Sequence, residues 1–174
     1  QWWAEETAGD LLTWQEGDGG WSYPGGHTDL SLTQYAALGL RASAALGAVI
    51  PPEIWNDMAE FALEHQESWR SVERKPAAGF HYREDHGFTG SMTTAGISIL
   101  VICREQLGDR MKPTIRKRVD EAIAAGERWL NLNFTARANP GDVSWHYYYL
   151  YGLERCGALL NTETFNGREW YWEG

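Results

Sequence analysis

The sequence predicts an all-α domain built from helical hairpins that repeat along the chain. Two observations lead to this prediction. A short aromatic pattern recurs about 60 residues further on, which indicates an internal repeat. Each copy is followed by one stretch of small and apolar residues and then by one amphipathic stretch, both of helical length. We expect no β-hairpins, because no clear alternation of apolar and polar residues competes with the helical pattern.

The repeat begins with a glycine-containing turn that carries an aromatic pair. The first copy contains residues 20–23 (GWSY), the second contains residues 79–82 (GFHY), and a weaker third copy contains residues 143–147 (VSWHY). We therefore divide a single domain, residues 1–174, into repeat units of about 15–66, 75–132 and 140–174, the last one incomplete.

Each unit is expected to hold an inner and an outer helix. Residues 30–46 and 91–107 are apolar nearly all round, and helices without a polar face belong inside a structure. The following helices start at Pro52 and Pro113 and are amphipathic, as expected for helices that begin with proline and cover a core. Residues 2–14 then form the outer helix of a preceding unit, which makes three inner and three outer helices.

Composition excludes several classes of function. The 174 residues include 24 acidic and 15 basic side chains, a net charge of −9, which argues against a nucleic-acid partner because phosphate binding needs clustered cations. No apolar run approaches the roughly 20 residues needed to cross a bilayer. The chain begins with Gln1 and shows no targeting segment, so we expect a processed protein or a piece of a longer one, and the compartment stays open.

Residues 15–21 fit the pattern Q-x-x-D-G-G-W, which has a physical interpretation. Gly19 and Gly20 permit the positive φ of a sharp reversal between antiparallel helices. Gln15 is placed to bond backbone groups left free at a helix end, and Trp21 offers a flat ring to cover the turn. We interpret this motif as structural.

The motif and the hairpin repeat resemble the squalene cyclase and protein prenyltransferase repeat superfamily. Residues 25–31 and 145–149 look like its uncharacterised bacterial branch. The resemblance implies an α/α toroid, of which this chain would form three of six hairpins. The other half would then come from residues outside this chain or from a second copy in a homodimer.

The resemblance leaves three hypotheses for function. The first is a toroid module that binds a ligand or partner without catalysis, and the second is a part of an enzyme acting on an isoprenoid or other lipid. The third is a carbohydrate-active toroid that uses clusters of His and Asp. The D-x-D-D motif with which terpene cyclases protonate their substrate is missing from the sequence, so we do not expect this chain alone to cyclise squalene. Whether the protein is an enzyme stays open.

In the resembled toroids, the N-terminal ends of the inner helices face the mouth of a central cavity. Candidate catalytic residues gather at the corresponding places: His27, Asp29, Asp85, His86, Asp142 and His146. One interpretation is helix capping alone, by Asp29, Ser31 and Ser91. The other is an acid–base site or a site for zinc or a similar divalent ion. His81 falls in the same region, so four of the five histidines lie at these places. The fifth, His65, is expected to face solvent on an outer helix.

Aromatic residues at the start of the third inner helix are candidate ligand contacts. Trp145, Tyr147 and Tyr149 would stack on an apolar or ring-shaped small ligand, or would pack between helices. Consecutive residues of a helix point in different directions, so at most two of them can share one pocket.

Overall fold

The computed structural model describes residues 2–84 and 86–174, apart from the side chain of Trp69. It is mainly helical, with seven α-helices in the described part of the chain. The mainly-α prediction is confirmed. The expectation of an all-α fold is wrong, because five short strands accompany the helices.

The helices and strands follow one another along the chain. The helices are α1 (Trp2–Thr13), α2 (Leu30–Ala45), α3 (Pro52–Glu64), α4 (Gly90–Leu107), α5 (Pro113–Asn133), α6 (His146–Leu160) and α7 (Trp170–Glu173), with a 3-10 turn at Gly108–Arg110. The strands are β1 (Gln66–Val72), β2 (Lys75–His81), β3 (Phe88–Thr89), β4 (Thr164–Phe165) and β5 (Arg168–Glu169).

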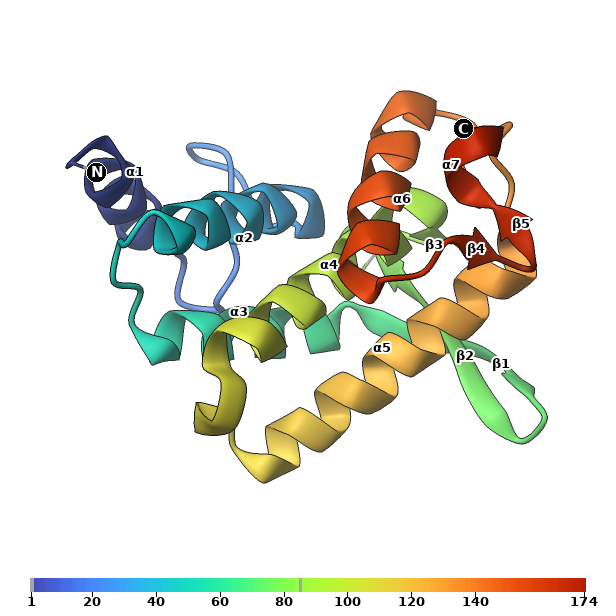
Figure 1. Ribbon diagram of the computed structural model, residues 1–174, viewed down its shortest axis with the longest axis horizontal. Helices are drawn as coiled ribbons and strands as arrows, with labels where there is room; N and C mark the ends of the chain where they lie inside the picture. The colour runs from blue at the N-terminus through green and yellow to red at the C-terminus, as the bar shows by residue number, and fades with distance from the viewer. Residues whose placement is uncertain (1, 85) are drawn as a thin grey trace.

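Helix α4 is the centre of the fold. It packs against α2, α3, α5 and α6 (Figure 1), and every residue from Gly90 to Cys103 is buried. This confirms the expectation that residues 91–107 form an inner helix. Helix α2 is only partly an inner helix, because Tyr35, Arg41 and Ala42 along it are exposed.

Close packing around α4 depends on glycines, which have no side chain. Phe80 from β2 is fully buried and lies against Gly96, where a Cβ atom would overlap its ring. Gly126 on α5 allows the same close approach to Ile97. The two cysteines, Cys103 and Cys156, are fully buried.

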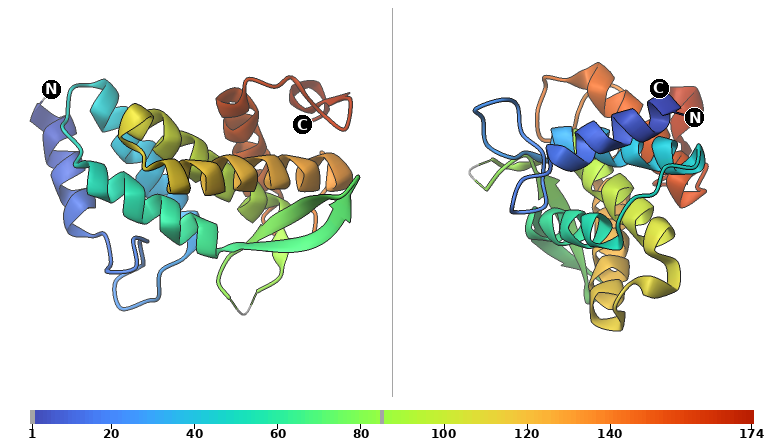
Figure 2. Two further views of the ribbon diagram at one scale, coloured as in Figure 1. Left: turned by 90° about the horizontal axis from the view of Figure 1, so that it is seen from below. Right: turned by 90° about the vertical axis from the view of Figure 1, so that its left-hand side faces the viewer.

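A β-hairpin that the helical pattern did not predict follows α3. Strands β1 and β2 pair antiparallel from Gln66 opposite Phe80 to Val72 opposite Lys75, and the hairpin projects from the helical body beside α5 (Figure 2). The inner strand, β2, reads Ala77, Ala78, Gly79 before Phe80. Small residues are needed here because a Cβ atom at Gly79 would lie 2.6 Å from Phe88. They also remove the apolar–polar alternation that marks a strand.

A second hairpin, β4–β5, also contradicts the expectation that the chain has no β-hairpins. Its turn is Asn166-Gly167, and both residues have positive φ, 54° and 70°. This dipeptide is a strong signal for a two-residue hairpin turn, because Asn and Gly tolerate positive φ. The Asn-Gly signal for this hairpin was therefore present in the sequence.

The Q-x-x-D-G-G-W segment joins α1 to α2 and α3. Gln15 Nε2 donates to the carbonyls of Gly19 (3.1 Å) and Ile54 (3.3 Å). Trp21 is buried, and its Nε1 donates to the carbonyl of Leu11 near the end of α1 (2.9 Å). Gly19 has a φ of 88°. The structural interpretation of the motif therefore fits the observed geometry.

The two ends of the described chain lie at opposite ends of the longest axis of the molecule (Figure 1). None of the helices formed by the described residues combines the length and apolar character that a membrane span requires.

Candidate functional site

Asp29 is the most deeply buried of the candidate catalytic residues that the structure describes. It caps α2: its Oδ1 accepts from the backbone N of Leu32 (2.9 Å) and from the hydroxyl of Ser31 (2.6 Å). Its Oδ2 accepts from the hydroxyl of Tyr82 (2.9 Å), which follows β2. Both oxygens are thus used to cap the helix and to hold Tyr82 at the N-terminal end of α2.

A second polar contact connects α2 to α6. The hydroxyl of Tyr148 donates to Gln34 Oε1 at 2.7 Å. Gln34 is fully buried, and its Nε2 has no hydrogen-bond partner within the described part of the chain. An unsatisfied buried donor costs free energy, so this amide favours an acceptor atom placed beside it.

Three tyrosines form a stacked group above this contact. The ring of Tyr35 stacks with that of Tyr148 at a centroid distance of 6.1 Å and with that of Tyr151 at 6.2 Å. Tyr35 is 51% exposed and Tyr151 is 37% exposed. Stacked aromatic rings with accessible edges and hydroxyls suit contact with an apolar or ring-shaped molecule. We call Tyr35, Tyr148 and Tyr151 the tyrosine face.

Burial keeps the tyrosine hydroxyls protonated. It raises the pKa of Tyr148 well above its usual range and raises that of Tyr35, which the neighbouring Tyr151 raises further. Burial also raises the pKa of Tyr82, and its hydrogen bond to Asp29 adds to the effect. These groups are therefore hydrogen-bond donors at neutral pH.

Arginines flank the tyrosines. The guanidinium of Arg155 lies 5.7 Å from the ring centroid of Tyr151, and that of Arg83 lies 5.1 Å from the ring centroid of Tyr82. Cations over π faces are attracted by the ring quadrupole, which helps to fix both rings.

Each of the other predicted catalytic residues that the structure describes has different surroundings. His27 is exposed, and the ring of His86 meets that of Tyr82 edge to face at 5.4 Å. Asp142 Oδ1 accepts from the backbone N of Ser144 (2.8 Å), and His146 Nε2 donates to the carbonyl of Ala136 (2.9 Å). The remaining candidate, Asp85, is outside the described residues.

No metal centre emerges from the residues that the structure describes, because no three His, Cys, Asp or Glu side chains among them are grouped to hold an ion. The capping interpretation fits Asp29. It does not fit Ser91, since the N-cap of α4 is Thr89, whose hydroxyl accepts from the backbone N of Met92 at 3.2 Å.

The predicted ligand contacts divide into surface and core residues. Trp145 and Tyr147 are exposed. Tyr149 is fully buried, and its ring packs where a Cβ atom at Gly90 would otherwise lie. Tyr149 therefore does not present its ring to a ligand. The tyrosine face instead uses Tyr148 and Tyr151. These two residues lie about one helical turn apart on α6, so their side chains can share one face of the helix.

His65 is buried rather than exposed. Its Nδ1 donates to the carbonyl of Phe61 (2.8 Å), and its ring lies 5.2 Å from that of His81. The β1–β2 hairpin explains why His65 is buried. His81, at the end of β2, covers the C-terminal end of α3, which would face water in an array of helices alone.

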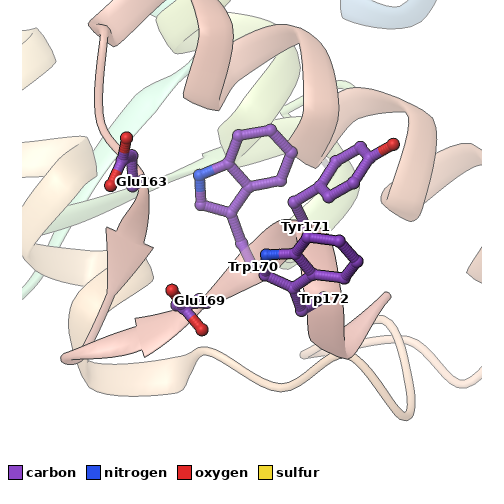
Figure 3. Close-up of a pocket in the computed structure, with 5 residues that line it drawn as sticks. All are labelled: Glu163, Glu169, Trp170, Tyr171 and Trp172. Carbon is purple, nitrogen blue, oxygen red and sulfur yellow. The ribbon is translucent and has the colours of Figure 1, made fainter.

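Two cavities involve the C-terminal segment, and only the first of them is also lined by α6. One, of about 250 Å³, has Tyr151, Leu150, Trp170 and Tyr171 in its lining. The other, of about 290 Å³, is lined by Glu163, Glu169, Trp170, Tyr171 and Trp172 (Figure 3). Tyr151 belongs both to the tyrosine face and to the first cavity.

Comparison of the chain with protein-family models, curated proteins and solved structures finds no match. The tyrosine face is therefore interpreted from its own geometry.

Proposed function

We propose that this chain is a toroid-type helical repeat module that binds a small ligand on its tyrosine face without catalysing a reaction. The observation that carries the proposal is the stacking of Tyr35 on α2 with Tyr148 and Tyr151 on α6. The three rings bring together two helices distant in sequence and leave aromatic surface accessible to solvent.

The chemistry of the face favours a ligand that is apolar or flat and carries an acceptor oxygen. Tyrosine rings supply apolar contact area at a low cost in side-chain entropy. The hydroxyl of Tyr35, whose side chain is half exposed, can donate a hydrogen bond to an acceptor oxygen on the ligand. Isoprenoid alcohols and sugars both have these features.

A binding role is favoured over catalysis by how the nearby polar groups are used. The carboxylate of Asp29 accepts three hydrogen bonds, two within its own helix start and one from Tyr82. A carboxylate committed to capping is poorly placed to move a proton to or from a substrate.

The proposal is tested by fluorescence titration of the whole chain with farnesol, an isoprenoid alcohol, and with cellohexaose, an oligosaccharide. We expect saturable binding of one of them. The double variant Tyr35→Ala, Tyr151→Ala should weaken it at least tenfold, whereas Tyr147→Ala, on the same helix, should not. Neither probe binding, or equal affinity of the double variant and the wild-type chain, would overturn the proposal.

A further inference from the structure

The cavity beside α7 combines aromatic rings and carboxylates in one small site. It has a volume of about 290 Å³ and is lined by two acidic and three aromatic residues. The carboxylates of Glu163 and Glu169 lie on one side of the rings of Trp170, Tyr171 and Trp172 (Figure 3). None of these five residues belongs to the tyrosine face, so a ligand in this cavity is independent of the function proposed for that face.

The three aromatic rings lining the cavity differ in orientation. The ring of Tyr171 is nearly perpendicular to that of Trp170 (83°, centroids 5.9 Å apart) and to that of Trp172 (87°, centroids 5.4 Å apart). All three rings line the cavity, so a rounded group inside it can contact more than one of them. A hydrogen bond from Trp170 Nε1 to the carbonyl of Thr162 (2.7 Å) fixes the innermost ring.

The β4–β5 hairpin places the two carboxylates. Thr164 pairs with Glu169 across the hairpin, and Glu163, which precedes Thr164, lines the same cavity as Glu169. In the part of the chain that the structure describes, neither carboxylate forms an ion pair, whereas Glu173 pairs with Arg168. Arg168, next to Glu169 in the sequence, is thus paired with another carboxylate, and Glu163 and Glu169 give the cavity two acidic groups.

We propose that this cavity binds a quaternary ammonium group such as that of choline. Such a cation has no N–H to donate, spreads its charge over methyl groups, and is held by π faces and by nearby carboxylates. Small, strongly hydrated cations are disfavoured here, because they need several oxygen ligands close together.

The experiment titrates the whole chain with choline chloride and follows tryptophan fluorescence, with sodium chloride added to keep the ionic strength constant. A matched probe, 3,3-dimethyl-1-butanol, has the same shape without the charge. We expect saturable binding of choline and at least tenfold weaker binding of the alcohol, equivalent to about 1.4 kcal/mol. Equal binding of the two probes, or no binding of choline, would overturn the proposal.

Variants test whether choline binds in this cavity. Trp172 is 80% exposed, so Trp172→Leu should leave the fold intact while weakening choline binding roughly tenfold. Glu163→Gln should weaken it by a smaller factor and removes no apolar contact. Trp2→Leu, at an equally exposed tryptophan on α1, should leave binding unchanged. A loss for Trp2→Leu as large as that for Trp172→Leu would place binding elsewhere and contradict the proposal.

The same headgroup occurs free and on phosphatidylcholine. Flotation of the chain with phosphatidylcholine vesicles separates the two sources: co-flotation that Trp172→Leu abolishes supports a lipid headgroup, and choline binding without co-flotation supports a free ligand.

Discussion

The hydroxyl of Tyr148 donates to Gln34 Oε1 at 2.7 Å, linking residues 114 positions apart in the sequence. The bond lies beneath the tyrosine face and holds α6 against α2. Since Gln34 is fully buried, its carbonyl oxygen depends on this one donor.

Tyr148→Phe should therefore destabilise the protein by about 1–2 kcal/mol, the typical cost of leaving a buried acceptor without its partner. Urea unfolding measures the difference. Tyr147→Phe is the matched control, because the Tyr147 side chain is exposed and removing its hydroxyl leaves no buried group without a partner. Equal stability of the Tyr148→Phe variant and the wild-type chain would show that the bond contributes nothing in solution.

Two glycines on helices should respond to alanine with opposite signs. Gly96→Ala places a methyl group where the Phe80 ring lies, and such overpacking costs about 1–3 kcal/mol. Gly9→Ala meets nothing within 4 Å and should stabilise α1 by about 0.5–1 kcal/mol, as alanine does inside an exposed helix. Thermal unfolding of both variants checks the packing of β2 against α4. A neutral Gly96→Ala would contradict the packing.

Stability should fall as the pH drops below about 6.5. Burial lowers the pKa of His81 from its usual 6.5, and the neighbouring His65 lowers it further, against the opposing effect of Glu67 and Glu84. The unfolded chain therefore takes up a proton at a higher pH than the folded one, so the folded state loses stability between pH 6.5 and the lowered pKa.

Urea midpoints at pH 7.5 and pH 5.5 measure this effect, and His81→Gln should reduce the difference between them. An unchanged difference in the variant would assign the pH dependence to other groups.

The inner and outer helices could be predicted because their signals are local. Pro52 and Pro113 begin α3 and α5 as expected, and the apolar stretch at 91–107 forms the buried α4. The β1–β2 hairpin was missed because Ala77, Ala78 and Gly79 are all small and show no strand alternation, and Gly79 is required by its close contact with Phe88. Tertiary contacts of this kind leave little trace in local patterns.

The site was predicted in part. Asp29 and the tyrosine run were recognised, and Asp29 is the helix cap that its position favoured. Tyr149, one of the predicted ligand contacts, is buried against Gly90, a packing contact that local spacing does not reveal. Tyr35 was not identified because it meets its partners only across the fold.

Closure of the toroid by a second copy is a prediction that concerns assembly. Light scattering of the purified chain should then give twice the mass of one chain at micromolar concentration. A single-chain mass throughout the accessible concentration range would contradict closure by a homodimer.

Ligand binding at the stacked tyrosines can be observed ring by ring, by NMR of the chain with ¹³C-labelled tyrosine rings during titration with farnesol and with cellohexaose. We expect the ring signals of Tyr35, Tyr148 and Tyr151, assigned by single substitutions to phenylalanine, to shift together and to saturate with one of the probes, while the signal of Tyr147 stays in place. Shifts confined to Tyr147 or Tyr171, or no shift with either probe, would contradict binding at the tyrosine face.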